Sequence, residues 1–293
     1  MITSWGSTSV LTGDDHGRYP HGNSLLIEGT DTTVIVDPSL SLVSRSSNPT
    51  VDVVLSSHAH EDHIAGNGLF PSAEVRIHRD DLVGLQSLEG LLAIYGMPPD
   101  VEKKWQEVLL RDFHYRPRAD ATAFSDNEVL DLGGTTVQVV HLPGHTRGHC
   151  GFLIEPDGVF YVGDIDLTGF GPYYGDAWSD LDEFETSLGR CREIDAGWFA
   201  TFHHRGVVEG RTAFLDLVNR FAAVIGAREE RLVDYLAEPH TMDDIVAHRF
   251  VYRPGVELLW VDYVERRMMG QHLVRLLQNG VVLELEAGRY RRA

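Results

Sequence analysis

Short β-branched runs separated by turn residues dominate the hydrophobic pattern of the first part of the chain. Residues 24–28 and 33–36 are apolar runs separated by the turn-prone segment 29–31, and a further apolar run covers 51–55. Such runs, bounded by Gly, Asp and Pro, are typical of buried strands. We therefore predict a β meander over residues 8–50 and a buried strand that ends at residue 55.

Helical and strand patterns then alternate along the chain. Apolar residues at helical spacing, with Pro98 and Pro99 between two segments, predict helices at 80–96 and 100–110. Strand patterns return, with Pro156-Asp157-Gly158 as a hairpin turn. The predicted strands are 75–77, 129–132, 135–141, 150–155, 159–162 and 197–202, and the predicted helices that follow are 180–194 and 211–238. This alternation predicts a mixed α/β (α+β) fold.

The last part of the chain has a pattern of its own. Thr241 is a suitable N-cap residue and predicts a helix that starts there. Residues 257–278 predict a longer helix that ends at Asn279-Gly280, and residues 281–291 predict a hairpin. Short helices, a long helix and a hairpin resemble a small winged-helix-like module. We therefore predict two domains, residues 1–226 and residues 227–293.

Length and composition indicate a globular protein. The chain has 293 residues, 43% of them hydrophobic and 24% charged, which suits one large domain with a small appendix. Its first residues lack the basic start of a signal peptide, and no apolar run is long enough to span a membrane. The two cysteines, Cys150 and Cys191, do not suggest a disulfide framework. We therefore expect a cytoplasmic protein.

The negative charge is concentrated in the larger predicted domain. Residues 227–293 hold 10 basic and 11 acidic residues, so −18 of the total formal charge of −19 lies on residues 1–226. An acidic body repels phosphate backbones and anionic lipids. We therefore expect a small-molecule substrate, and neither nucleic acid nor a membrane as partner. The nearly neutral C-terminal module is expected to cover the site or to form a homodimer contact.

Four potential metal ligands occur within six residues directly after the predicted strand 51–55. They are His58, His60, Asp62 and His63. In an extended chain His58 and His60 point the same way, and a turn into a helix directs Asp62 and His63 to a neighbouring position. Imidazole nitrogens with a carboxylate form a ligand set suited to zinc, iron or manganese.

Further histidines and an aspartate follow later strands. Pro143-Gly144 bends the chain and presents His145 beyond a strand end, with His149 four residues later. Gly163-Asp164 follows the predicted strand 159–162, and His203-His204-Arg205-Gly206 follows the strand 197–202. Each of these short motifs lies where a strand ends, which is where strands deliver functional side chains to one edge of a sheet.

The spacing His58-x-His60-x-Asp62-His63 resembles the metal-binding motif of the metallo-β-lactamase superfamily, in the glyoxalase II-like branch. The Pro-Gly-His-Thr-x-Gly-His run and Gly163-Asp164 are similar to later motifs of this family. The resemblance implies an αββα sandwich with a two-metal site. It assigns His58, His60 and His145 to one metal ion, Asp62, His63 and His204 to the other, and Asp164 to both.

The doubled histidine leaves the last ligand open. His204 is favoured because His-x-Gly-Val-Val matches the ending of the family motif better from that position, and His203 is the ligand if the register is one residue off. The resemblance also gives Asp37 a supporting role behind the histidine loop, against a simple turn before Pro38. Tyr173 and Tyr174 either contact substrate above the site or pack in the interior.

The resemblance implies a hydrolase in which two divalent ions, most simply zinc with iron or manganese as alternatives, share an activated hydroxide. That hydroxide would attack a small thioester, lactone or other ester. Asp62 is assigned as a ligand that can also handle protons. The basic side chains that would hold glutathione carboxylates are missing from obvious motif positions, which puts glyoxalase II activity itself in doubt.

Three alternatives remain open. A mononuclear iron oxygenase of the persulfide dioxygenase type would use His58, His145 and Asp164. A nuclease of the same superfamily is the second, and the negative charge of residues 1–226, which repels a phosphate backbone, counts against it. A non-catalytic sensor is the weakest alternative, because the full ligand set is present.

Overall fold

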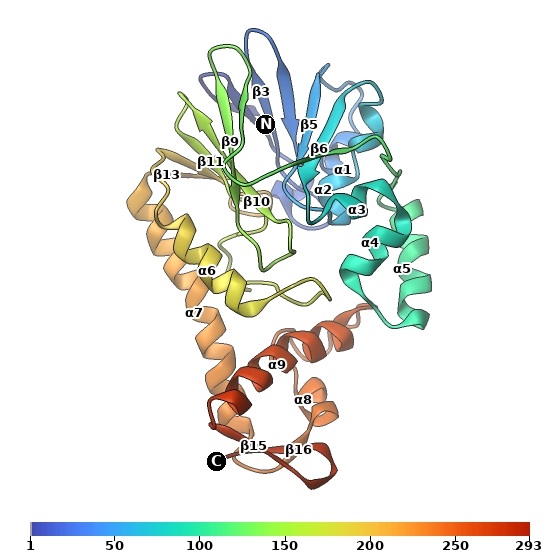
Figure 1. Cartoon of the computed structure of the whole chain (residues 1–293), viewed down its shortest axis with the longest axis vertical. Helices are drawn as coiled ribbons and strands as arrows, with labels where there is room; N and C mark the ends of the chain where they lie inside the picture. The colour runs from blue at the N-terminus through green and yellow to red at the C-terminus, as the bar shows by residue number, and fades with distance from the viewer. Residues whose placement is uncertain (1) are drawn as a thin grey trace.

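Two β-sheets packed face to face form the body of the protein, and helices cover both outer faces. The computed structural model describes residues 2–293, and Figure 1 shows the sheets side by side with α3–α5 next to one and α6–α7 next to the other. The predicted αββα sandwich is therefore confirmed.

The first sheet contains the N-terminal meander. Within residues 2–293 it has seven strands in the order of the sequence. Strands β1 to β4 pair antiparallel, whereas β4, β5, β6 and β7 run parallel. The strands are β1 Ile2–Trp5, β2 Thr8–Leu11, β3 Ser24–Glu28, β4 Thr33–Val36, β5 Val53–Ser56, β6 Glu74–His78 and β7 Thr122–Phe124. The carboxyl ends of β4, β5 and β6 consequently lie at the same edge.

The second sheet is built from later strands. In the described chain its order is β13-β12-β11-β10-β9-β8, and β9, β11 and β12 share one direction because β10 runs opposite to both neighbours and β11 pairs parallel with β12. The strands are β8 Val129–Asp131, β9 Thr136–His141, β10 Cys150–Glu155, β11 Val159–Tyr161, β12 Trp198–Ala200 and β13 Val207–Glu209. The ends of β9, β11 and β12 again meet at one edge.

Period-two alternation of side chains builds three layers of core. Val53 and Leu55 point between the sheets, where they join Phe152, whereas Val54 packs on the outer face against the helices.

The helices on the first sheet are α1 Leu40–Val43, α2 Glu61–Ile64, α3 Leu82–Gln86, α4 Leu88–Tyr95 and α5 Pro99–Arg111, with 3-10 turns at Asp14–Gly17 and Asn67–Leu69. Those on the second sheet are α6 Leu181–Cys191 and α7 Arg211–Tyr235.

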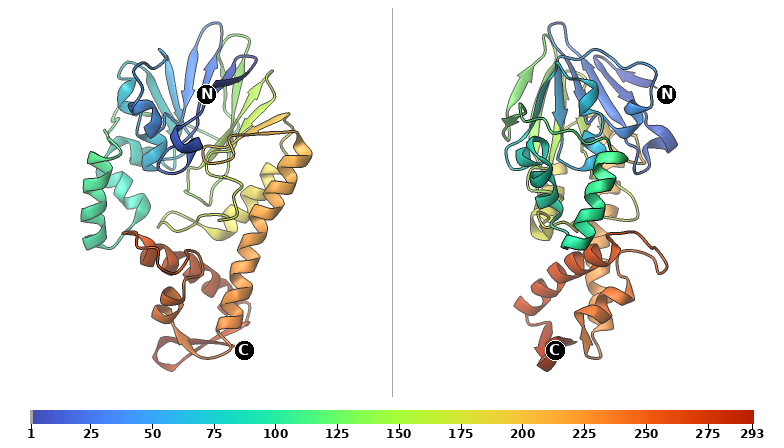
Figure 2. Two further views of the ribbon diagram at one scale, coloured as in Figure 1. Left: turned by 180° about the vertical axis from the view of Figure 1, so that it is seen from behind. Right: turned by 90° about the vertical axis from the view of Figure 1, so that its right-hand side faces the viewer.

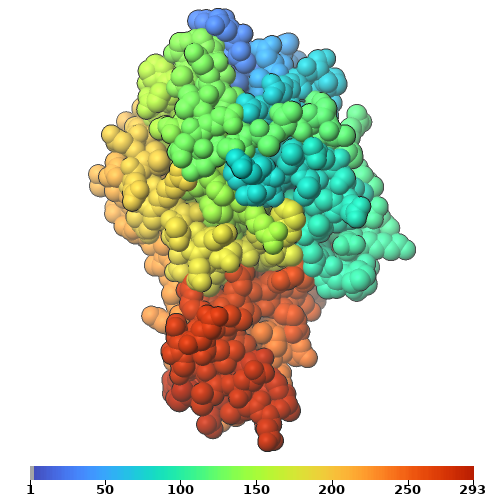
Figure 3. All heavy atoms as spheres, in the orientation of Figure 1, coloured from blue at the N-terminus to red at the C-terminus, as the bar shows by residue number. Residues whose placement is uncertain are grey.

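The C-terminal part forms a narrower lobe below the sandwich (Figures 2 and 3). It contains β14 His240–Thr241, α8 Met242–His248, α9 Val261–Gln278, β15 Val282–Leu285, a 3-10 turn at Glu286–Gly288, and β16 Arg289–Arg292, with the three strands in one small sheet. Helix α7 passes residue 226 without a break, so the predicted boundary lies inside a helix. The division into two domains and the winged-helix-like resemblance stay predictions.

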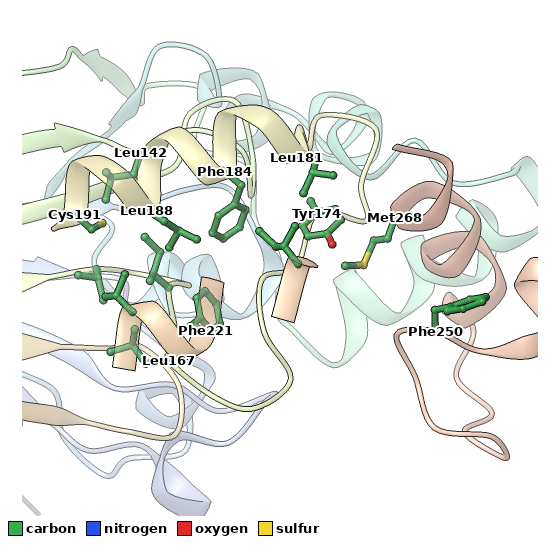
Figure 4. Packing of buried hydrophobic residues seen from close by; sticks show 14 of the residues in the cluster. Leu142, Leu167, Tyr174, Leu181, Phe184, Leu188, Cys191, Phe221, Phe250 and Met268 are labelled. Carbon is green, nitrogen blue, oxygen red and sulfur yellow. The ribbon is translucent and has the colours of Figure 1, made fainter. Parts of the chain in front are cut away.

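One hydrophobic cluster joins this lobe to the sandwich. Phe221 of α7 packs in the same cluster as Tyr174, Met268 of α9 and Phe250 (Figure 4). Because these apolar side chains are shared, the lobe is fixed against the second sheet by buried surface and not by chain connectivity alone.

Two of the predicted helices have different bounds in the structure. The segment 80–96 is two helices, because Ser87 is extended and its side chain caps α4 by accepting from the Gly90 amide. The capping box of Thr241 and Asp244 confirms the predicted start of α8. Helix α9, however, begins at Val261, and residues 257–260 belong to the loop before it.

None of the helices in residues 2–293 combines the length with the apolar character that crossing a membrane requires.

Candidate metal centre

The predicted ligand motifs come together where strands of both sheets end. His58 follows β5, Asp164 follows β11 and His203 follows β12. Gly163 has a φ of +53°, and a Cβ there would lie 2.6 Å from His149 Nε2. Only glycine allows this close turn, which places Asp164 beside the histidine loop.

One group of donors consists of His58, His60, His145 and Asp164. Their donor atoms lie within 4.8 Å of one another. His60 Nδ1 is 2.9 Å from His145 Nε2, and His145 Nε2 is 3.3 Å from Asp164 Oδ2. The three histidines are buried. Such close imidazole nitrogens repel one another unless a proton or a cation lies between them, so this group fits a bound cation.

A second group consists of Asp62, His63 and His203. His203 Nε2 is 3.0 Å from Asp62 Oδ2, and all three side chains are buried. Asp164 lies between the two groups, because its Oδ1 is 2.9 Å from His63 Nε2 while its Oδ2 faces His145. The carboxylate of Asp164 thus presents one oxygen to each group.

Four of the five imidazoles have their other ring nitrogen within 3.0 Å of a carboxylate or backbone carbonyl oxygen, and three of these contacts are hydrogen bonds. Such contacts fix the orientation and tautomer of a metal-binding histidine. The partners are Asp176 Oδ2 for His60 Nε2 at 3.0 Å, Asp37 Oδ2 for His63 Nδ1 at 2.8 Å, the Tyr173 carbonyl for His145 Nδ1 at 2.9 Å, and the Gly17 carbonyl for His203 Nδ1 at 2.9 Å.

His58 shows most directly that the donors fit a metal ion. Its Nδ1 lies 3.0 Å from Ser57 Oγ, whereas its Nε2 is buried and has no hydrogen-bond partner among residues 2–293. A buried polar atom without a partner is costly, and here it lies in the group with His60 and His145. A divalent cation bound by nitrogen and carboxylate ligands satisfies this atom.

The electrostatics of the cluster also favour cations. Burial lowers the pKa of His60, but the Asp176 carboxylate outweighs burial and raises the pKa to about 9. Burial likewise opposes protonation of His203, yet Asp164 and Asp62 raise its pKa to about 9. The pKa of His58 is well below its usual value, because burial and the neighbouring imidazoles disfavour a charge there. The carboxylates thus attract positive charge to the space between the two groups.

The structure corrects the register of the last ligand. His203, and not His204, lies beside Asp62 and His63. His204 has a φ of +53°, so the chain turns sharply there, and its side chain lines the cavity outside the donor groups. Neighbouring side chains point in different directions, and resemblance to a motif did not fix which of the two faces inward.

The remaining predicted residues divide between the site and the interior. Besides holding His63, Asp37 accepts from the Ser57 amide at 2.6 Å and from the Tyr161 hydroxyl at 2.7 Å. Tyr173 lines the cavity. Tyr174 is buried away from it, with its hydroxyl 2.8 Å from His272 Nε2, so of its two predicted alternatives the structure has the interior packing and not the contact above the site.

Asp81 is a supporting residue that no sequence motif indicated. Its buried carboxylate accepts from the Ala59 amide at 3.2 Å, the Gly148 amide at 2.8 Å and the Thr146 hydroxyl at 2.6 Å. It therefore joins the loop that carries His58 and His60 to the loop that carries His145. Only the pairing of β5 with β6 brings it there.

Replacement of Asp81 by asparagine should lower the free energy of unfolding by about 2–4 kcal/mol, because an amide nitrogen would face backbone donors in a buried position. Urea denaturation of the full chain measures this effect. The matched control is Asp80→Asn at the exposed neighbouring position, which should change the free energy by less than about 0.5 kcal/mol. Equal effects of the two substitutions would contradict the role given to Asp81.

A cavity of about 430 Å³ opens from the metal centre. Aromatic side chains supply much of its lining, and they are Tyr19, Tyr95, Trp105, Phe170, Tyr173, Tyr252 and Trp260. Among residues 2–293, neither Lys nor Arg lines it, whereas five acidic residues do, and they are Glu61, Asp62, Asp164, Asp166 and Asp176. Its size suits a small molecule.

The model of the metallo-beta-lactamase superfamily matches residues 18–225. This match spans most of the chain and all the donor residues, so the chain belongs to the metallo-β-lactamase superfamily, and its fold and clustered ligands support a metal-dependent hydrolase.

Several proteins of this superfamily resemble the chain. A hydroxyacylglutathione hydrolase of Prochlorococcus marinus is 26% identical over 47% of this chain and 47% of its own length. An N-acyl homoserine lactonase of a Bacillus species is 31% identical over 36% of this chain and 33% of its own. The chain thus spans half or less of the length of these two curated relatives. A metallo-beta-lactamase family protein from Thermus thermophilus shares the fold over 98% of this chain and 99% of its own, with a TM-score of 0.71 and 22% identity.

Proposed function

We propose that the protein is a dinuclear metallohydrolase that cleaves a small thioester, lactone or other ester. The observation that supports this most is Asp164, whose two oxygens face two separate donor groups. His58, His60 and His145 would hold one ion, and Asp62, His63 and His203 would hold the other. Zinc is the first expectation for such a set, with iron or manganese as alternatives.

Two bound divalent ions would activate a water molecule and polarise the carbonyl group of the substrate. The protein itself holds the donors in place: Asp37, Asp176 and two backbone carbonyls orient four of the imidazoles. Asp62 also lines the cavity, so its carboxylate is placed to exchange a proton with the substrate as well as to hold an ion. The aromatic lining excludes bulk water around the carbonyl group.

The cavity and the names of the relatives support the proposed substrate class. A cavity of this size without basic lining residues suits a small molecule and offers a phosphodiester backbone no Lys or Arg side chain to contact. One relative is named as a lactonase, and an Aspergillus fumigatus relative, 26% identical over half of this chain, is named as a thioesterase. These names support carbonyl substrates, and we propose that nucleic acid is not cleaved.

The test begins with metal content. Elemental analysis of freshly purified protein should find close to two divalent ions per chain, because there are two donor groups and Asp164 faces a histidine of each. The same preparation is then assayed on neutral thioesters, on lactones and on single-stranded RNA. Turnover of a carbonyl substrate with no RNA cleavage supports the proposal.

Two results would contradict it. A single tightly bound iron per chain, with turnover of a persulfide in the presence of oxygen, would indicate the oxygenase alternative. RNA cleavage without carbonyl turnover would indicate a nuclease.

A further inference from the structure

The loop between α8 and α9 contributes the outer wall of the cavity. We call residues 250–260 the wall segment, and three of its side chains, Tyr252, Leu258 and Trp260, line the cavity. The Trp260 ring lies 5.2 Å from the Trp105 ring and 6.4 Å from the Tyr19 ring, measured between centroids. The C-terminal lobe thus completes an aromatic enclosure that the sandwich alone leaves open.

A buried carboxylate of α9 fixes the start of this segment. Glu265 is fully buried, and its side chain accepts from three successive backbone amides, those of Phe250 at 3.1 Å, Val251 at 3.0 Å and Tyr252 at 2.7 Å. Within residues 2–293 it makes no ion pair with a basic side chain. Its hydrogen bonds therefore hold the loop and direct Tyr252 toward the cavity.

Helix α9 is itself tied to the opposite wall of the cavity. The Tyr263 hydroxyl donates to the Tyr95 carbonyl at 2.7 Å, and Tyr95 lines the cavity, stacked on His60 at 5.4 Å between ring centroids. The wall segment is thus held near both of its ends relative to the metal centre. A segment that selects substrates requires such fixed positioning.

The acidic side chains that line the cavity outside the two donor groups already have hydrogen-bond partners. Glu61 accepts from the hydroxyls of Tyr19, at 2.9 Å, and Tyr95. Asp176 accepts from the Tyr173 hydroxyl at 3.3 Å and lies 3.0 Å from His60 Nε2. Asp166 accepts from the amide and hydroxyl of Thr168 at 3.0 Å. A substrate therefore meets ring faces and satisfied carboxylates, an environment that suits an uncharged apolar group and repels an anionic one.

We propose that the wall segment is the specificity element of the site, that it takes an uncharged aromatic or long apolar acyl group, and that Glu265 is the positioning residue that holds it. This inference rests on the proposed hydrolase function and adds the class of substrate to it. It also assigns a role to the C-terminal lobe.

The first test is a kinetic comparison of N-acetylcysteamine thioesters with uncharged and anionic acyl groups, with the metal-loaded full chain. Hexanoyl thioester should be cleaved with a kcat/KM at least about tenfold above that of adipoyl thioester, which has an anionic end in place of a methyl group. The ratio of kcat/KM for 4-phenylbutanoyl to acetyl thioester should fall about tenfold in Trp260→Ala, mainly through KM, and recover in Trp260→Phe.

The role of Glu265 is tested by a matched pair of substitutions. Glu265→Gln places amide hydrogens against the loop amides. The ratio of kcat/KM for 4-phenylbutanoyl to acetyl thioester should therefore fall, as it is expected to fall in Trp260→Ala. Glu238→Gln makes the identical change at an exposed position outside the wall segment and outside the cavity lining, and it should keep the wild-type ratio. A wild-type ratio in both Glu265→Gln and Trp260→Ala, or a preference for the adipoyl ester, would overturn the proposal.

A binding measurement separates this inference from the proposed function. Calorimetric titration with 4-phenylbutanamide, a neutral compound with the same aromatic chain, should show binding to the wild-type protein and about tenfold weaker binding to Trp260→Ala. If thioesters are hydrolysed but wild type and Trp260→Ala bind 4-phenylbutanamide equally well, the proposed role of the wall segment is overturned and the hydrolase function stands. If binding of 4-phenylbutanamide depends on Trp260 but no thioester is hydrolysed, the proposed hydrolase function is overturned and the proposed role of the wall segment stands.

Discussion

Replacement of Asp164 by alanine should lower carbonyl turnover by about a thousandfold and reduce the metal content below two ions per chain. The carboxylate presents one oxygen to His63 and the other to His145, so its loss affects both groups. Loss of a residue that only supports a metal ligand typically costs about 10- to 100-fold, and a ligand shared by two ions should cost more. Steady-state kinetics and elemental analysis on one preparation measure both effects.

Asp166→Asn is the matched control for that substitution. Asp166 is two residues further along the same loop and lines the same cavity, but it is outside both donor groups. It should keep two ions per chain. Full metal content and full turnover in Asp164→Ala would exclude the proposed sharing of this carboxylate.

The second large effect is expected at His203. His203→Ala should lose one of the two ions and reduce turnover by about a hundredfold or more, because its Nε2 lies 3.0 Å from Asp62 in the second donor group. His204→Ala should keep both ions, since His204 is outside the donor groups. Metal content of the two variants, purified in parallel, decides the assignment.

The reverse result would restore the register favoured by the sequence motif. If His204→Ala lost the ion and His203→Ala kept it, the turn at His204 would have to differ in the metal-bound protein from the one seen here. Loss of the ion in both variants would mean that the loop as a whole, and not one imidazole, determines metal binding.

Much of the donor set was predictable because it depends on local chain geometry. His58, His60, Asp62 and His63 lie in one loop directly after a strand, and their spacing alone directs them toward one place. His145 and Asp164 follow glycine turns at the ends of other strands. Parallel strands deliver their carboxyl ends to a shared edge, so a strand pattern with such motifs predicts a common site.

The supporting residues were less accessible from the sequence. Asp37 was indicated by a family resemblance, whereas Asp81 and Asp176 have no motif of their own. Asp81 reaches two ligand loops only because β5 pairs with β6. Asp176 reaches His60 from a loop more than 100 residues away in the chain. Such contacts depend on how distant segments pack, which no local pattern records.

The sequence by itself predicted most strands and helices of the sandwich from side-chain periodicity. Six of the clustered donor residues and the superfamily were predicted from short motifs that resemble those of the family. Only the tertiary structure placed His203 rather than His204 beside Asp62 and His63, packed Tyr174 in the interior, brought Trp260 to the cavity wall, and placed Glu265 behind the loop that carries Trp260. Each of those outcomes depends on the direction of one side chain or on contact between distant segments. Direction and contact are set by the packing of the whole chain, since neighbouring residues with the same composition point to different sides of the backbone.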